Sequence, residues 1–162
     1  MIIRDGKTSD AAHILTFWNP QIRDTAITFT TLLKTEAGLC EDMRACAAEN
    51  RAFLVVERAH NVVGVATWGR FRSGPGYVHT GEHSIVLAAA ERGKGTGRAL
   101  LSALEDRAKG AGLHVLVAGV SAENPGAIAF HEAMGYKRVG CLPQVGRKFD
   151  RWMDLILLQK TL

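Results

Sequence analysis

The stretch Glu82-His-Ser-Ile-Val-Leu-Ala-Ala-Ala-Glu-Arg-Gly-Lys-Gly-Thr-Gly97 joins an apolar segment to a turn rich in glycine. Ile85–Leu87 has the apolar character of a strand, and a run with helical periodicity, Arg98–Lys109, follows the turn. Three alternating glycines leave successive backbone N–H groups unscreened by side chains, and such groups bind anions when they lie at a helix N-terminus. The stretch therefore predicts a strand, an anion-binding turn and a helix in that order.

The spacing within this turn excludes two other kinds of phosphate loop. A P-loop needs Ser or Thr directly after its lysine, whereas Lys94 is followed by Gly95. A dinucleotide-binding turn needs its third glycine three residues after the second, and Gly97 follows Gly95 by only two. The remaining pattern is Arg92-x-x-Gly95-x-Gly97, which by itself is also compatible with a tight turn that binds nothing.

Periodicity and turn signals along the chain predict the element order β-α-α-β-β-β-α-β-α-β-β. Pro20 should kink or end the first helix near Trp18 or Asn19, unless the helix re-forms beyond the proline. Asp24–Thr31 is expected to be an ordered loop. The strand, glycine turn, helix and strand of the second half imply one parallel pair inside a mostly antiparallel sheet. The other expected elements are a strand at residues 2–3, a helix over 35–50, strands over 52–57, 62–68, 77–87 and 115–120, a helix begun by Asn124-Pro125, and a closing pair over 136–142 and 148–158.

Composition limits the classes of protein that the chain can be. Its 162 residues suffice for one domain over 1–162. No apolar run reaches the length of a membrane span, and the first residues do not resemble a signal peptide, so we expect a cytoplasmic protein without membrane contact. Cys40, Cys46 and Cys141 have no metal-ligand spacing, and no metal is expected. The net charge of +4 suits a polyanionic small molecule; nucleic acid is not expected, because the basic residues are scattered.

The glycine turn resembles the pyrophosphate loop of the GNAT superfamily, the GCN5-related N-acetyltransferases. Three further segments resemble its phosphinothricin and methionine sulfoximine N-acetyltransferase branch: Glu82-His83-Ser84, the run from Ser121 to Tyr136, and Val145-Gly-Arg-Lys-Phe-Asp-Arg-Trp-Met-Asp154. The resemblance covers nearly the whole chain. It implies the α+β GNAT fold, with a mixed, mostly antiparallel sheet, helices on both faces and a splayed parallel strand pair.

The resemblance also implies acetyl-CoA as cosubstrate. Pantetheine would lie beside the central strand like an added strand, with the Leu87 amide polarising the thioester carbonyl. Asn124 would contact the pantetheine amide, although its other role is that of a helix N-cap. The residues expected to hold acetyl-CoA are Ile85, Val86, Leu87, Gly93, Lys94, Gly95, Thr96, Gly97, Arg98 and Asn124.

For the chemistry, Glu82 is the candidate general base, and partial burial would raise its pKa toward neutrality. The alternative for Glu82 is a solvated strand residue. His131 is a candidate acid or second base, since many relatives carry a tyrosine acid on that helix face; a structural histidine is the alternative. With the Leu87 amide, these form the predicted catalytic set.

Arg70 and Arg72, two residues apart, are candidates for binding an amino-acid carboxylate, or else they lie on a solvated edge. The other candidate substrate-binding residues are Thr28, Phe29, Glu82, Lys148 and Trp152, the last two at the site or at a dimer contact. The resemblance implies a homodimer that acetylates the α-amine of methionine sulfoximine, methionine sulfone or phosphinothricin. The alternatives are another amine (a polyamine, an aminoglycoside or a protein N-terminus) or a non-catalytic acyl-CoA-binding module.

Overall fold

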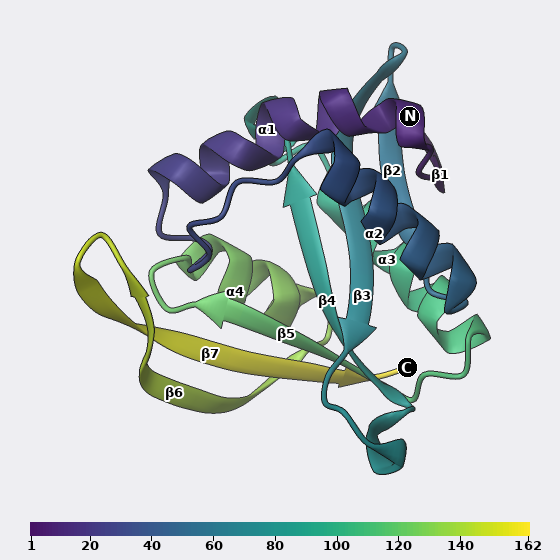
Figure 1. Cartoon of the computed structure of the whole chain (residues 1–162). Coiled ribbons are helices and arrows are strands. Elements are labelled where there is room, and N and C mark those ends of the chain that lie inside the picture. The colour runs from purple at the N-terminus through teal and green to yellow at the C-terminus, as the bar shows by residue number, and fades with distance from the viewer.

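A seven-stranded mixed sheet forms the centre of the computed structural model, which describes all 162 residues (Figure 1). Its strands lie in the order β1-β2-β3-β4-β5-β7-β6. Every neighbouring pair is antiparallel except β4 with β5, which confirms the predicted fold class. The strands are β1 Ile2–Asp5, β2 Phe53–Arg58, β3 Asn61–Arg70, β4 Thr80–Leu87, β5 Val115–Ser121, β6 Lys137–Lys148 and β7 Arg151–Thr161.

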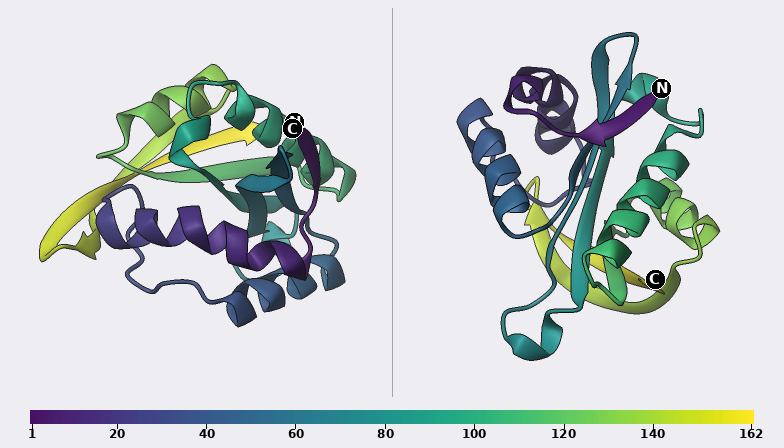
Figure 2. Two further views of the ribbon diagram at one scale, coloured as in Figure 1. Left: turned by 90° about the horizontal axis from the view of Figure 1, so that it is seen from above. Right: turned by 90° about the vertical axis from the view of Figure 1, so that its right-hand side faces the viewer.

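Two helices cover each face of the sheet. Helices α1 (Ala11–Asp24) and α2 (Glu36–Ala48) lie on one face, and α3 (Thr96–Gly110) and α4 (Pro125–Ala133) lie on the other (Figure 2). Side chains alternate between the two faces along each strand, so neighbours such as Val55 and Val56 enter different hydrophobic clusters. Short 3₁₀ turns occur at Thr8–Asp10, Pro75–Tyr77 and Ala89–Glu91. None of the helices is long and apolar enough to cross a membrane.

The parallel strands β4 and β5 separate after a short paired stretch. Their register joins Thr80 to Val115 and Glu82 to Val117, and no pairing follows. Helix α3 makes the crossover between them, as the order of strand, glycine turn and helix predicts. Because β4 continues to Leu87, its last five residues have no strand beside them on the β5 side. The sheet is therefore open at its centre.

The bounds of two elements differ from the main expectation. Of the alternatives left open at Pro20, an end near Trp18 is wrong, because helix α1 continues through the proline to Asp24. The apolar face of this helix is buried on both sides of the proline, by Phe17 and Ile22, and that burial outweighs one missing backbone hydrogen bond. Lys148 ends β6 instead of beginning β7, because the turn between the two strands is at Phe149 and Asp150, both with positive φ.

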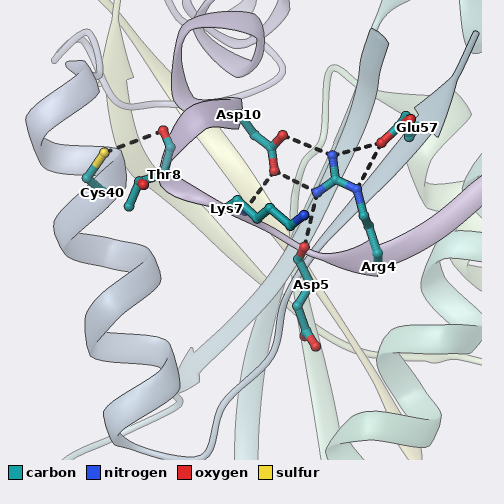
Figure 3. Close-up of polar contacts among 7 residues, drawn as sticks. All are labelled: Arg4, Asp5, Lys7, Thr8, Asp10, Cys40 and Glu57. Atoms are coloured by element: carbon teal, nitrogen blue, oxygen red, sulfur yellow. Dashed lines mark hydrogen bonds and ion pairs between the residues drawn. The ribbon is translucent and has the colours of Figure 1, made fainter. Parts of the chain in front are cut away.

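An ion cluster fastens β1 to the start of α1 and to β2 (Figure 3). Two guanidinium nitrogens of Arg4 donate to the carboxylate of Asp10, at 2.8 and 3.0 Å, and its Nε donates to Glu57 at 2.9 Å. Burial opposes ionisation of Asp10, but the bonds from Arg4 and from the Lys7 backbone N–H outweigh it, so the pKa of this carboxyl is below its usual value. The cluster holds α1 against the sheet.

Candidate active site

A cavity of about 1110 Å³ lies where β4 and β5 separate. The ends of these two strands form its sides, and the N-terminal part of α4 closes one face. Helix α1 and the loop that follows it close the other face, and the glycine turn before α3 lines one end. The cavity therefore reaches both faces of the sheet through the gap between the strands.

The glycine turn has the backbone geometry of an anion site. Gly93 and Gly95 have φ angles of 75° and 78°, in the left-handed region that favours glycine. Gly97 has no positive φ, but a Cβ there would make a tight contact, 3.3 Å from the Leu87 side chain. The N–H groups in the first turn of α3, including that of Arg98, have no intrahelical partner. No side chain caps this helix, so none accepts from these groups in place of one. These N–H groups fit a diphosphate.

Two side chains of the turn, those of Lys94 and Thr96, are not part of the cavity lining and bond to Glu91, which is part of it. The buried hydroxyl of Thr96 donates to the Glu91 carboxylate at 2.9 Å, and Lys94 Nζ lies 3.4 Å from its other oxygen. Arg58 of β2 also donates to Glu91, at 3.0 Å. The hydrogen bond from Thr96, together with the charges of Arg58 and Lys94, holds the pKa of Glu91 below its usual value. For a bound phosphate, Thr96 thus offers its backbone N–H rather than its hydroxyl.

The hydrogen bonds between β3 and β4 fix which backbone groups of β4 face the gap. The Phe71 N–H donates to the Thr80 carbonyl at 3.3 Å, and the Ala88 N–H donates to the Val63 carbonyl at 2.8 Å. Antiparallel bonding alternates along a strand. The even-numbered residues of β4 therefore direct their backbone groups to β3, and the odd-numbered ones direct theirs away from it.

Ile85 and Leu87 consequently present their backbone groups to the gap, whereas Val86 lines the cavity with its side chain. The Leu87 carbonyl accepts a hydrogen bond from Gln21 Nε2 at 3.0 Å. The Oε1 of Gln21 lies 3.4 Å from Arg92 of the glycine turn. Sequence reasoning missed Gln21, since it follows the proline that was expected to end the helix; no local signal marks it.

Glu82 lies at the point where β4 and β5 separate, on the face of the sheet covered by α1 and α2. Its carboxylate lies over Gly119 of β5: a Cβ on that glycine would be 2.8 Å from Oε1. Burial raises the pKa of the Glu82 carboxyl, and the positive charge of Arg72 opposes this effect. Gly119, which the sequence analysis did not single out, lines the cavity.

On the opposite face, His131 of α4 contacts His83 of β4, and both line the cavity. Their Nε2 atoms are 3.0 Å apart, and His131 Nδ1 lies 2.7 Å from the Ala127 carbonyl oxygen. The Nδ1 of His131 must therefore carry hydrogen, so its Nε2 accepts from His83 in the neutral pair. His83 Nδ1 is then buried without a hydrogen-bond partner. The sequence analysis gave His131 a candidate role but gave none to His83, which it named only within the Glu82-His83-Ser84 segment.

The other predicted site residues occupy varied positions. Asn124 lines the cavity and accepts the Ala127 N–H through Oδ1 at 3.1 Å, so it is the N-cap of α4 and keeps its amide N–H₂ free. Thr28 lines the cavity. Arg70 and Arg72 are exposed and lie outside the cavity lining.

Glu82, although it lies against Gly119, is not part of the cavity lining, and three more predicted substrate-binding side chains do not line the cavity either. The ring of Phe29 packs on Gly146. Lys148 is buried, and its ammonium donates to three backbone carbonyls. Trp152 is exposed on the β6–β7 hairpin beside Arg147. In this chain, none of the three is placed to touch a molecule in the cavity directly.

The splayed sheet, uncapped helix and open strand edge define an acyltransferase of the GNAT type. Residues 19–136 match the model of the acetyltransferase (GNAT) family, and the chain belongs to this family. It is 36% identical to the L-amino acid N-acyltransferase MnaT of Escherichia coli (strain K12), over 100% of this chain and 94% of the relative. It is also 36% identical to an L-methionine sulfoximine/L-methionine sulfone acetyltransferase of Pseudomonas paraeruginosa, over 99% and 94%.

Solved structures agree with this assignment. A ribosomal-protein-alanine N-acetyltransferase from Brucella melitensis superposes with a TM-score of 0.96 at 35% identity, over 100% of both chains. The acetyltransferase yncA of Salmonella typhimurium, solved with its cofactor acetyl-CoA, superposes with a TM-score of 0.95 at 36% identity, over 100% of this chain and 94% of that one. The fold and enzyme class expected from the sequence are thus confirmed.

Proposed function

We propose that this enzyme transfers acetyl from acetyl-CoA to the α-amine of a small amino acid of the methionine sulfoximine, methionine sulfone or phosphinothricin type. One observation carries the proposal: an unpaired strand edge and an uncapped helix line one cavity, and the Glu82 carboxylate, whose pKa is raised, lies against Gly119 of that lining. The names of the similar relatives support the amino-acid acceptor. We take residues 1–162 as one catalytic domain that acts in the cytoplasm.

The diphosphate would be held by the backbone N–H groups from Gly93 to Arg98, with the basic side chains of Arg92 and Arg98 nearby. Pantetheine would extend along β4, where Ile85 and Leu87 offer backbone groups and Asn124 offers its free amide. The Leu87 N–H would donate to the thioester oxygen as negative charge develops there. This arrangement uses the main chain more than side chains.

Glu82 would remove the first proton from the substrate ammonium, directly or through a water molecule. The neutral amine then attacks the acetyl carbon, the C–N bond forms and the C–S bond breaks. The leaving thiolate takes the second amine proton, and the net reaction releases one proton. The His83–His131 pair lies on the other side of the gap, which would be the side of the leaving thiolate. The two rings would act there together, because His131 Nε2 already has a hydrogen bond to His83.

The loop after α1 contributes three apolar side chains to the cavity lining, which suit a methionine-like acceptor: Ile27, Leu32 and Leu33. Arg72, whose charge acts on Glu82, is the nearer of the two candidate arginines for a substrate carboxylate. A protein N-terminus is the second candidate acceptor, because a close structural neighbour carries the name of a ribosomal-protein-alanine N-acetyltransferase.

We further propose a homodimer. Five large apolar side chains are exposed on the β6–β7 hairpin: Val139, Leu142, Val145, Phe149 and Trp152. A second copy of the chain would cover this surface. Sedimentation velocity would give twice the chain mass; a monomer at micromolar concentration would contradict the proposal.

Release of coenzyme A thiol, measured with acetyl-CoA and a panel of amines, tests the proposed activity. We expect L-methionine sulfoximine and L-methionine sulfone to be turned over, and a peptide with N-terminal alanine, spermidine and an aminoglycoside to be much poorer acceptors. Preferred turnover of the peptide would replace the amino-acid acceptor by a protein N-terminus. Binding of coenzyme A without turnover of any amine would indicate a non-catalytic module.

A further inference from the structure

The loop between α1 and α2 forms one wall of the cavity without regular structure of its own. Residues 26–33 make no backbone–backbone hydrogen bond. Ile27, Thr28 and Leu32 of this loop line the cavity. A wall that carries so few internal bonds depends on contacts from outside the loop for its position.

Lys148 supplies the first of these contacts from the end of β6. Its side chain is only 4% exposed, and its Nζ donates to the carbonyls of Ile22, Thr25 at 2.7 Å and Thr28 at 3.0 Å. An ammonium has three N–H donors, so all are used. The Ile22 carbonyl belongs to the last turn of α1, where the helix dipole favours a cation. Lys148 therefore binds the end of α1 and the start of the loop together.

The second contact comes from the same face of β6, two residues earlier. The Phe29 ring packs directly on Gly146, and a methyl group on that glycine would overlap the ring. Gly146 has no positive φ, so alanine fits its backbone and only the contact would change. In Figures 1 and 2 the loop that leaves α1 runs beside the outer part of the β6–β7 hairpin. The hairpin thus holds the loop at two points.

We propose that Lys148 is a positioning residue for the amine acceptor: through the loop carbonyls it sets the cavity wall formed by Ile27 and Thr28. The inference rests on the proposed acetyltransferase function. The ammonium has no donor left for a substrate carboxylate, so its effect passes through the loop. The glycine turn and the β4 edge lie elsewhere in the cavity lining. Loosening the loop should therefore affect the amine and leave acetyl-CoA binding unchanged.

Steady-state kinetics of Lys148→Met and Gly146→Ala, with KM measured separately for L-methionine sulfoximine and for acetyl-CoA, test this inference. We expect the amine KM to rise about tenfold in both variants, with acetyl-CoA KM within about twofold of wild type. Lys148→Arg should restore part of the loss, because a guanidinium also donates to carbonyls. Gly146→Ala keeps the buried charge, so it serves as the test if Lys148→Met does not fold.

Arg51→Met is the matched control. Arg51 is also a largely buried cation that donates to a backbone carbonyl, that of Trp68 at 2.6 Å, but it lies outside this cavity. A parallel rise in acetyl-CoA KM, or the same change in Arg51→Met, would overturn the inference.

If wild type turns over no amine, the proposed function fails but the positioning role can still be tested. Amide hydrogen exchange at residues 26–33 should then be faster in Lys148→Met and Gly146→Ala than in wild type and Arg51→Met. Unchanged exchange would overturn the positioning role independently of activity.

Discussion

The Nε2 atoms of His83 and His131 lie 3.0 Å apart in a buried contact, and His131 Nδ1 is bonded to the Ala127 carbonyl. This chain of contacts fixes the tautomer of both rings when the pair is neutral. Burial lowers the pKa of His83 to about 3, and it also lowers the pKa of His131. A histidine pair that lines the cavity therefore stays uncharged at neutral pH.

The first prediction concerns this pair. Because the folded-state pKa of His83 is below that of the unfolded chain, the unfolded chain binds more protons and stability falls as pH decreases from about 6.5. His83→Phe should remove part of that pH dependence. Urea unfolding between pH 5 and 8, with ¹⁵N NMR of the rings, measures both effects. Titration of either ring near its ordinary pKa in the folded wild type would contradict the assignment.

The second prediction is a pH dependence of kcat set by Glu82. Its carboxyl must be ionised to accept a proton, so kcat at saturating substrates should fall at acid pH with an apparent pKa above the ordinary glutamate value. Glu82→Gln should lower kcat by about 100-fold and remove this limb. Arg72→Met should move the limb to higher pH, because the charge of Arg72 opposes the raised pKa. Unchanged turnover in Glu82→Gln would exclude the base role.

The third prediction concerns Gly119, which leaves space for the Glu82 carboxylate. A Cβ there would lie 2.8 Å from Oε1 of Glu82, so Gly119→Ala should displace the carboxylate and lower kcat by about tenfold. Gly140→Ala is the matched control, since a Cβ at that strand glycine meets no atom within 4 Å. Equal kcat in the two variants would show that the carboxylate position does not matter for turnover.

The fourth prediction concerns stability. Asp10→Asn removes the charged partner of Arg4 and should lower the free energy of unfolding by about 2 kcal/mol at neutral pH. The pKa of Asp10 is depressed in the folded state, so its contribution is present above the unfolded-state pKa of about 4 and is lost as pH falls through the lower folded value. Urea unfolding of both proteins at pH 7 and pH 3 should show the difference shrinking at the lower pH. A constant difference would contradict the cluster's role.

Local sequence signals predicted most of the fold. The glycine turn predicted where α3 begins, and Asn124-Pro125 predicted the start of α4. Pro20 was a poor guide to the end of α1. The free-energy cost of a proline inside the helix is smaller than the free energy gained by burying the helix face around it, and that burial depends on the sheet on which the helix packs. The extent of β6 was also missed, since its outer part is mostly exposed and has no apolar period.

The site was predicted less completely than the fold. Backbone positions followed from the glycine pattern, but Gln21, His83 and Gly119 reach the cavity only through tertiary contacts that no local pattern encodes. Thr96 and Lys148 were expected to touch ligands, yet their polar groups bond inside the protein. Whether a polar side chain faces a cavity or a neighbouring strand depends on packing, which the sequence alone does not reveal.

Calorimetric titration of coenzyme A into wild type, Gly95→Val and Gly74→Val tests whether the backbone N–H groups of the glycine turn bind the diphosphate. Both glycines have positive φ, 78° and 107°, and a Cβ on either meets no protein atom. Gly74, with ψ of 152°, is in the region more strictly limited to glycine, so the control carries at least as much backbone strain, and only Gly95 lies at the cavity. We expect coenzyme A to bind wild type and Gly74→Val, and to bind Gly95→Val at least about tenfold more weakly. Equal affinity in all three proteins would contradict this prediction.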